Sequence, residues 1–169
     1  MNEQDRRRET ARSIRRWISL GLFLVAAAST AAPAKPSSPC DQKWVIAGDV
    51  SGILRLPIVT AKNVPGDAQS CEFKTESFPA IQVTFRPGLG KITVETWAAG
   101  KMPSKATPLV GVGDRAVWVD DLHEVDAQKD NALCVVTANG AGRDFAIGKS
   151  ELQKRLGGLC NQIFSRVRR

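Results

Sequence analysis

Residues 70–75 and 80–86 alternate apolar with polar side chains, and this period of two indicates strands with one buried face. Because only a short turn-like stretch separates the two segments, we expect them to pair as an antiparallel hairpin. The side chains expected to point inward are Cys71, Phe73, Thr75, Ile81, Val83 and Phe85.

Four more segments predict strands in the second half of the chain. Residues 91–97 are rich in β-branched side chains and favour a strand, with a short helix as the alternative. Residues 115–119 follow a glycine-containing turn, and residues 122–128 and 132–138 predict a hairpin. Together with the first pair, these segments predict an antiparallel sheet of about five strands.

Two helices are predicted to flank the strands. The first begins at Asp41, which is a suitable cap, and continues to about Arg55 with apolar residues at helical spacing. The second begins at Ser150, and Gln153 completes a capping-box pattern. We expect the Gly157–Gly158 pair in this helix to reflect close packing or a kink. The apolar stripe of the second helix consists of Leu152, Leu156, Leu159, Cys160, Ile163 and Val167.

These elements predict an α+β fold. We expect a two-layer sandwich, in which the antiparallel sheet is covered by an N-terminal and a C-terminal helix. The expected domain organisation is a signal peptide at residues 1–34, a Pro/Ser linker at 35–39 and one disulfide-stapled domain at 40–169.

The first 34 residues have the three parts of a secretory signal peptide. Arginines crowd residues 6–16, a largely apolar run occupies residues 17–28, and small residues lead to an Ala-Pro-Ala site ending at Ala34. Cleavage after Ala28 and retention of the segment as an N-terminal anchor are the alternatives. We therefore expect a periplasmic or secreted protein with no membrane span in its mature chain.

The charge balance changes once this segment is removed. Of the 24 Lys and Arg and the 17 Asp and Glu residues, six basic and three acidic ones lie in residues 1–34, so the net charge falls from +7 to +4. A nucleic-acid-binding protein needs a concentrated basic face, and the remaining pattern shows none. We expect no nucleic-acid partner.

Four cysteines lie in the predicted mature chain, at positions 40, 71, 134 and 160. An even number behind an export signal predicts two disulfides. Three pairings are possible, and we favour Cys40–Cys71 and Cys134–Cys160, because each ties a predicted strand to a predicted helix.

The order of these motifs carries a resemblance. Cys40 precedes a helix and the strand segment Cys71–Phe73, and residues 109–118 contain Gly-x-Gly-Asp-x-Ala-x-Trp before a hairpin with Cys134. The chain resembles a family of small exported bacterial proteins of unknown function and is distantly similar to small cell-envelope lipoproteins, although Cys40 lacks a lipobox. The resemblance covers most of residues 40–165, and it implies the fold and the compartment but no activity.

Residues 111–114 superficially resemble a phosphate-binding loop. They lack its full glycine spacing and its strand–helix context, so we expect a turn. The chain has one histidine, no Gly-x-Ser-x-Gly motif and no cysteine left over from the disulfides, so it offers no activated nucleophile. We expect a protein that is not an enzyme and has no cofactor.

The densest polar cluster contains Asp121, His123, Glu124 and Asp126. A metal site is the specific interpretation of this cluster. Strand alternation places Glu124 and Asp126 on one face and His123 on the other, which leaves too few convergent ligands. We therefore expect no metal and a solvated hairpin face.

Trp97 precedes residues 98–108, which contain glycine and two prolines and predict a loop. We expect Trp97 to be exposed and to form a binding edge with Lys101 and Met102, because binding residues concentrate on loops. The sequence thus predicts an exported, non-enzymatic envelope protein that binds an unknown envelope protein or small ligand. A small-ligand carrier and an exported cation-dependent enzyme using the hairpin Asp121–Asp126 are the alternatives.

Overall fold

The structure is a computed structural model that describes residues 37–76, 79–140 and 147–167. The predicted signal peptide, residues 1–34, lies outside the described residues, and so does the start of the predicted linker. The elements of the fold all belong to the predicted domain of residues 40–169.

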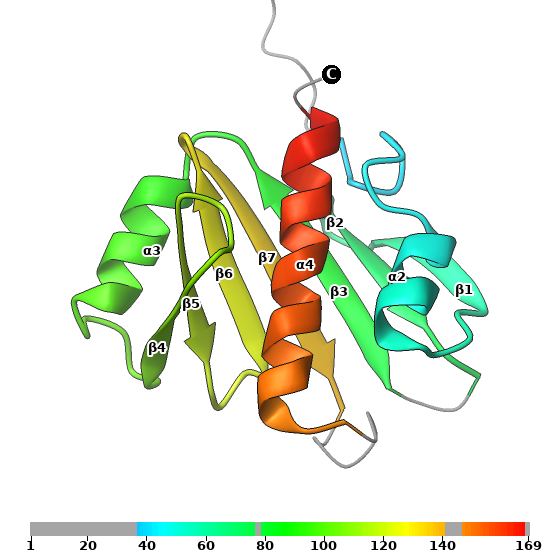
Figure 1. The fold of residues 1–169 in the computed structure, drawn as a ribbon. Coiled ribbons are helices and arrows are strands. Elements are labelled where there is room, and N and C mark those ends of the chain that lie inside the picture. Colours follow the sequence, from blue (N-terminus) through cyan, green and yellow to red (C-terminus); the bar gives the residue numbers. More distant parts are fainter. Residues whose placement is uncertain (1–36, 77–78, 141–146, 168–169) are drawn as a thin grey trace, which may run out of the picture. The chain divides into compact units, whose positions relative to one another are not determined.

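Seven strands in the described residues form one sheet, in which every neighbouring pair is antiparallel (Figure 1). The strands are β1 (Thr60–Val64), β2 (Asp67–Lys74), β3 (Ala80–Arg86), β4 (Ala106–Leu109), β5 (Arg115–Val119), β6 (Glu124–Lys129) and β7 (Ala132–Asn139). Their order across the sheet is β1-β2-β3-β7-β6-β5-β4. Two meanders therefore meet where β3 pairs with β7.

The two predicted hairpins are confirmed, since β2 pairs with β3 and β6 pairs with β7. The prediction of about five strands is too low, because both edge strands were missed. Four of the five residues of β1 are exposed, and β4 has only four residues, one of which is Pro108. Short, exposed or proline-containing strands are typical of sheet edges, and they lack the alternation that marks a buried strand.

Residues 91–97, which favoured a strand, lie within the helix α3 (Gly90–Ala98), so the alternative of a short helix is the one observed. Helical spacing places Val94 and Trp97 on one buried face, whereas Ile92 is 65% exposed. Burial of that face outweighs the strand preference of β-branched residues, which is weak and depends on context.

The two predicted flanking helices are present, with different starting points. α2 (Ala47–Leu54) is shorter than predicted because residues 39–45 form turns and bends. Asp41 does not cap it; instead, the Asp41 carboxylate accepts hydrogen bonds from Asn63 Nδ2 at 3.0 Å. α4 (Lys149–Val167) confirms the predicted C-terminal helix and buries most of its apolar stripe, but it begins before Ser150, which lies in its first turn and is not its cap.

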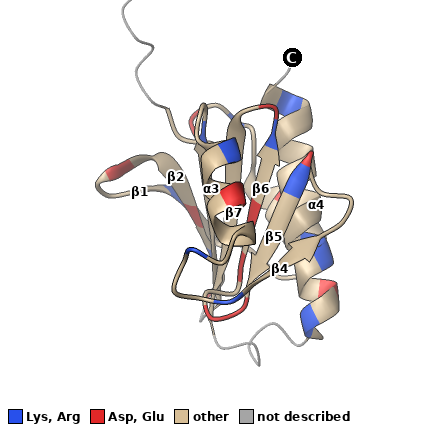
Figure 2. Ribbon diagram, turned by 90° about the vertical axis from the view of Figure 1, so that its left-hand side faces the viewer, with Lys and Arg blue, Asp and Glu red and all other residues tan. Residues whose placement is uncertain are grey.

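Helices lie on both faces of the sheet. α2 and α4 pack against each other over one face, and α3 packs over β4, β5, β6 and β7 on the other. Figure 2 shows α3 and α4 on opposite sides of β5 and β6, with basic and acidic residues interspersed over the visible ribbon. The fold is α+β as predicted, but α3 adds a partial third layer to the expected two-layer sandwich.

Both favoured disulfides are present. Cys40 and Cys71 have their Cα atoms 5.6 Å apart and join the N-terminal turn to β2. Cys134 and Cys160 have theirs 5.8 Å apart and join β7 to α4. Among the described residues, the helices are too short or too polar to cross a membrane.

Candidate functional site

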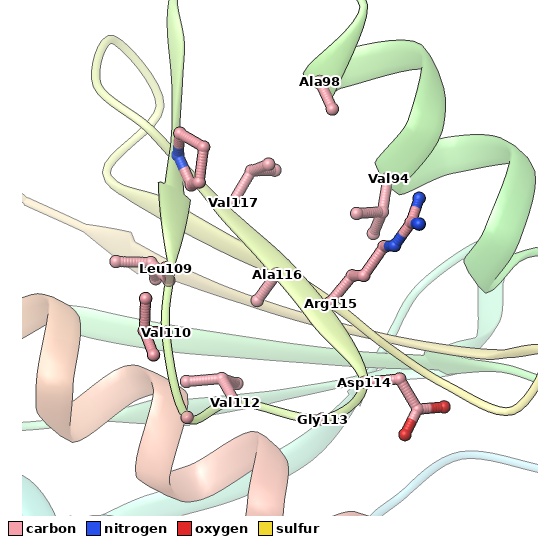
Figure 3. Close-up of a pocket in the computed structure, with 12 residues that line it drawn as sticks. Val94, Ala98, Leu109, Val110, Val112, Gly113, Asp114, Arg115, Ala116 and Val117 are labelled. Atoms are coloured by element: carbon pink, nitrogen blue, oxygen red, sulfur yellow. The ribbon is translucent and has the colours of Figure 1, made fainter.

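A groove of about 440 Å³ lies between α3 and the segment that connects β4 to β5 (Figure 3). Val94 and Ala98 line it from α3, and Val117 lines it from β5. Further apolar lining comes from Pro108, Leu109, Val110, Val112 and Ala116. A largely apolar concavity of roughly 300–1,000 Å³ is typical of a ligand site.

A second groove, of about 490 Å³, lies against α4. Both grooves are lined by residues 109–112 of the same loop, which we call the Val110 loop (residues 109–113). Val110 itself is 99% exposed. The α4 side of the second groove is more polar and is lined by Ser150, Gln153, Lys154, Gly158 and Asn161.

The Val110 loop is held in place by Asn161 of α4. The Gly113 amide donates to Asn161 Oδ1 at 2.8 Å, and Asn161 Nδ2 donates to the Gly111 carbonyl oxygen at 2.8 Å. Gly113 has a φ of 54°, and a Cβ there would lie 2.2 Å from the Gln128 carbonyl oxygen, so the position requires glycine. The Asp114 amide donates a hydrogen bond to the Gln128 carbonyl oxygen at 2.7 Å. The Gly113 and Asp114 amides therefore already have acceptors within the protein, as expected for a structural turn.

Asp114 and Arg115 form the charged end of the first groove. Arg115 lies 3.6 Å from Glu95 of α3 in an exposed ion pair, which contributes little stability. Asp114 Oδ2 accepts the Asp130 amide at 2.6 Å. Both side chains are engaged within the protein, so the apolar walls dominate what this groove can bind.

Beneath α3, the structure unites two residues that the sequence analysis assigned to separate candidate sites. The buried Trp97 side chain lies near the carboxyl group of Asp126, which is only 2% exposed. Glu124 lies two residues earlier on the same face of β6, and its charge also acts on Asp126. Thr137 lies directly opposite Glu124 across the β6–β7 pair, and its hydroxyl donates to Glu124 Oε2 at 2.6 Å.

Burial, together with the charge and hydrogen bond of Glu124, raises the pKa of Asp126 from 3.8 to about 8, and the hydrogen bond from Trp97 opposes this only in part. Asp126 Oδ1 has no hydrogen-bond donor in the described residues. A proton on Asp126 turns the carboxyl into a donor toward Glu124 and removes one of two adjacent negative charges. Burial beside Glu124 therefore favours the protonated form of Asp126.

The expectation that Trp97 is exposed is wrong, since the side chain is 7% exposed. Segment 91–97 is a helix, and helical spacing turns the indole toward the sheet. Lys101 and Met102, the other residues of the predicted binding edge, lie on the following loop, where Lys101 is exposed and Met102 is 37% exposed. The three residues therefore do not form one exposed edge.

The polar hairpin is not a solvated face throughout, because Asp126 is buried. Asp121 is exposed, and the His123 ring lies edge-on to Trp118 with centroids 6.2 Å apart. Glu124 and Asp126 lie on the other face, beneath α3. Within the described ranges, no three His, Cys, Asp or Glu side chains come together to hold a metal ion.

The grooves could not be predicted from the sequence because residues 109–113 carry only a turn signal. Val112, the valine between two glycines in this turn, is 8% exposed, so the flanking glycine did not indicate which valine is exposed. No known family model matches this sequence, and no curated protein or solved structure is significantly similar to it. In the described part of the chain, the fold and the site define an α+β protein with a seven-stranded antiparallel sheet and an apolar groove beside its edge.

Proposed function

We propose that the chain is an exported, non-enzymatic binding domain whose partner docks on the Val110 loop and its two grooves. The observation that carries the proposal is the 99% exposure of Val110 on a loop that Asn161 holds in place. Covering an exposed apolar side chain is favourable. A loop already held in one conformation loses little entropy on binding, which favours association further.

The partner we propose is a protein segment of the cell envelope that carries apolar side chains. A small molecule would fill only one groove and would leave the other side of the Val110 loop uncovered. A segment that crosses the loop fills both grooves, of about 440 and 490 Å³, and covers Val110 between them.

This partner is expected to insert side chains and not to extend the sheet at β4. The Lys105 carbonyl oxygen accepts a hydrogen bond from the Asp120 amide. In an antiparallel pair every second residue directs its amide and carbonyl groups to the same neighbour, so those of Thr107 and Leu109 also face β5. This alternation directs the backbone nitrogen of Pro108 toward the open edge. Proline has no amide hydrogen, so strand addition lacks a donor there.

A small-ligand carrier is the second candidate, because the groove between α3 and β5 alone has the size and apolar lining of a ligand site. The proposal of a cation-dependent enzyme has less support. Glu124 and Asp126 are two carboxylates beneath α3, and neither lines either groove.

Photo-crosslinking tests the proposal. A benzophenone side chain replaces Lys154, which is exposed and lines the second groove, and crosslinks are formed in envelopes of the native host. We expect one discrete protein adduct that disappears in the additional Val110→Asp variant. A matched Val59→Asp variant, at a position 58% exposed outside both grooves, should keep it. An adduct that survives Val110→Asp contradicts the proposal. Native mass spectrometry of the purified protein distinguishes the second candidate function, because a small-ligand carrier should retain a small apolar molecule that adds to the measured mass.

A further inference from the structure

We propose that Asp126 and Glu124 form a proton-controlled latch beneath α3: with their shared proton in place, α3 lies on the sheet, and loss of that proton lifts the C-terminal half of α3 and reshapes the first groove. The functional meaning of reshaping the first groove rests on the proposed binding function. The movement of α3 itself does not depend on that function.

The latch begins with the position of the two carboxyl groups. Asp126 is 2% exposed and has one oxygen without a donor, and Glu124 adjoins it on the same face of β6. Two adjacent ionised carboxylates in a buried site repel each other and are poorly solvated. Ionisation of both groups therefore favours any movement that admits water.

The movement available is set by how α3 is attached. At its start, the Gly90 amide donates to the Asn131 carbonyl oxygen at 2.9 Å, and a Cβ on Gly90 would lie 2.2 Å from the Ala132 carbonyl oxygen. This end is in close backbone contact with the β6–β7 turn. At the other end, Trp97 is the last buried residue, and residues 98–103 are exposed. The C-terminal half is therefore the part that can lift.

Trp97 connects the pair to the helix, because its indole is the buried anchor of this half and lies near Asp126 on β6, against which α3 packs. Val94 and Ala98 on the same half line the first groove. A displacement that brings water to Asp126 thus moves one wall of the groove.

The other charged groups near the pair do not replace the proton. From α3, Lys91 is exposed and Glu95 is paired with Arg115 of β5 at 3.6 Å. β7 and β4 carry no charged residue, and the remaining charged residue of β6, Lys129, alternates to the opposite face from Asp126. No cation from these elements compensates a second negative charge at Glu124 and Asp126.

The test is a titration of the purified, oxidised protein from pH 5 to 10, followed by NMR. Side-chain carboxyl ¹³C shifts report the proton on Asp126, and hydrogen exchange of the amides of residues 94–98, corrected for its intrinsic pH dependence, reports α3. We expect one midpoint near pH 8 in both signals. Asp126→Asn, which keeps a neutral donor, should retain protection up to pH 10.

Two further variants complete the experiment. Glu124→Gln removes the neighbouring charge, so the midpoint should move by about one unit or more toward acid. Asp121→Asn, which changes an exposed carboxylate of the same hairpin, should leave the midpoint unchanged. A midpoint of Asp126 near 4, or α3 protection that is constant across the titration, overturns the latch.

The groove is followed separately with anilinonaphthalene sulfonate as an apolar probe. Probe fluorescence should change with the same midpoint in the wild-type protein and stay constant in Asp126→Asn. A groove that binds no probe at any pH, with α3 still released near pH 8, counts against the proposed binding function and leaves the movement of α3 standing.

Discussion

Val112 of the Val110 loop packs directly on the backbone of Gly157 in α4. A Cβ at position 157 would lie 2.6 Å from Val112 Cγ2, which is closer than two carbon atoms can approach. The adjoining Gly158 has open space around it, with no atom within 4 Å of a Cβ. Of the two glycines that weaken α4, the first is therefore required by the contact that seats the loop.

Gly157→Ala is expected to destabilise the protein. Alanine favours a helix over glycine by about 1 kcal/mol, but overpacking against a stiff β-branched side chain costs about 1–3 kcal/mol. The net loss should be measurable by chemical denaturation. Gly158→Ala is the matched control and should raise stability by about 0.5–1 kcal/mol. Combining Gly157→Ala with Val112→Ala should recover part of the loss, and equal effects of the two glycine substitutions would rule out the contact.

Asp49→Asn should weaken the contact between α2 and α4 and so destabilise the protein. The Asp49 carboxylate accepts hydrogen bonds from two nitrogens of Arg166, from Gln162 Nε2 at 2.7 Å and from the Ile46 amide at 2.9 Å. Burial raises the pKa of Asp49, but these hydrogen bonds outweigh it and lower the pKa below its usual value. Loss of the charge should cost about 1–3 kcal/mol in denaturation. Asp121→Asn, at an exposed carboxylate, should change little.

The pH dependence of stability should have a maximum in mildly acidic solution. The raised pKa of Asp126 means that the native state holds a proton which the unfolded chain releases near pH 4, so stability falls as pH rises toward about 8. The lowered pKa of Asp67, which comes first from its hydrogen bond with Ser70, and that of Asp49 act oppositely and reduce stability below about pH 4.

Thermal unfolding from pH 3 to 9 checks this expectation. Tm should be highest near about pH 5 and decline toward alkaline pH. Asp126→Asn should flatten the alkaline decline and exceed the wild-type Tm at pH 8. If the variant declines as steeply as the wild-type protein, another group is responsible.

Removal of the Cys134–Cys160 disulfide should destabilise the domain. The bond spans 26 positions of the sequence, and a loop of that size is worth about 3–4 kcal/mol in the chain-entropy model. The Cys134→Ala/Cys160→Ala protein should lose that amount in denaturation. Intact mass of the wild-type protein should rise by four hydrogens on reduction, since two disulfides are present. A rise of two hydrogens would contradict one of the pairs.

The central part of the fold was predictable because burial on one face of a strand or helix leaves a periodic pattern. Segments 70–75 and 80–86 alternate, and five of the six side chains predicted to point inward are buried: Cys71, Phe73, Ile81, Val83 and Phe85. The C-terminal helix shows its stripe at helical spacing. The pairing of the four cysteines followed from the same elements, since each favoured pair joined a strand to a helical segment.

The candidate site was less predictable, because it depends on contacts between residues far apart in the chain. Asn161 holds the Val110 loop across a separation of 48 positions, and Trp97 reaches Asp126 only because segment 91–97 is helical. No local pattern distinguishes an exposed loop valine from one that a neighbouring helix covers.

The sequence by itself determined the α+β class and the inward faces of the first two central strands, since local periodicity records which side of each element is buried, and it favoured the observed cysteine pairing without excluding the other two. Only the tertiary structure decided that α3 is a helix on the opposite face, that Asp126 is buried beside Glu124, and that Val110 stands between two grooves. Those features depend on which elements meet, and the packing of the whole sheet determines that.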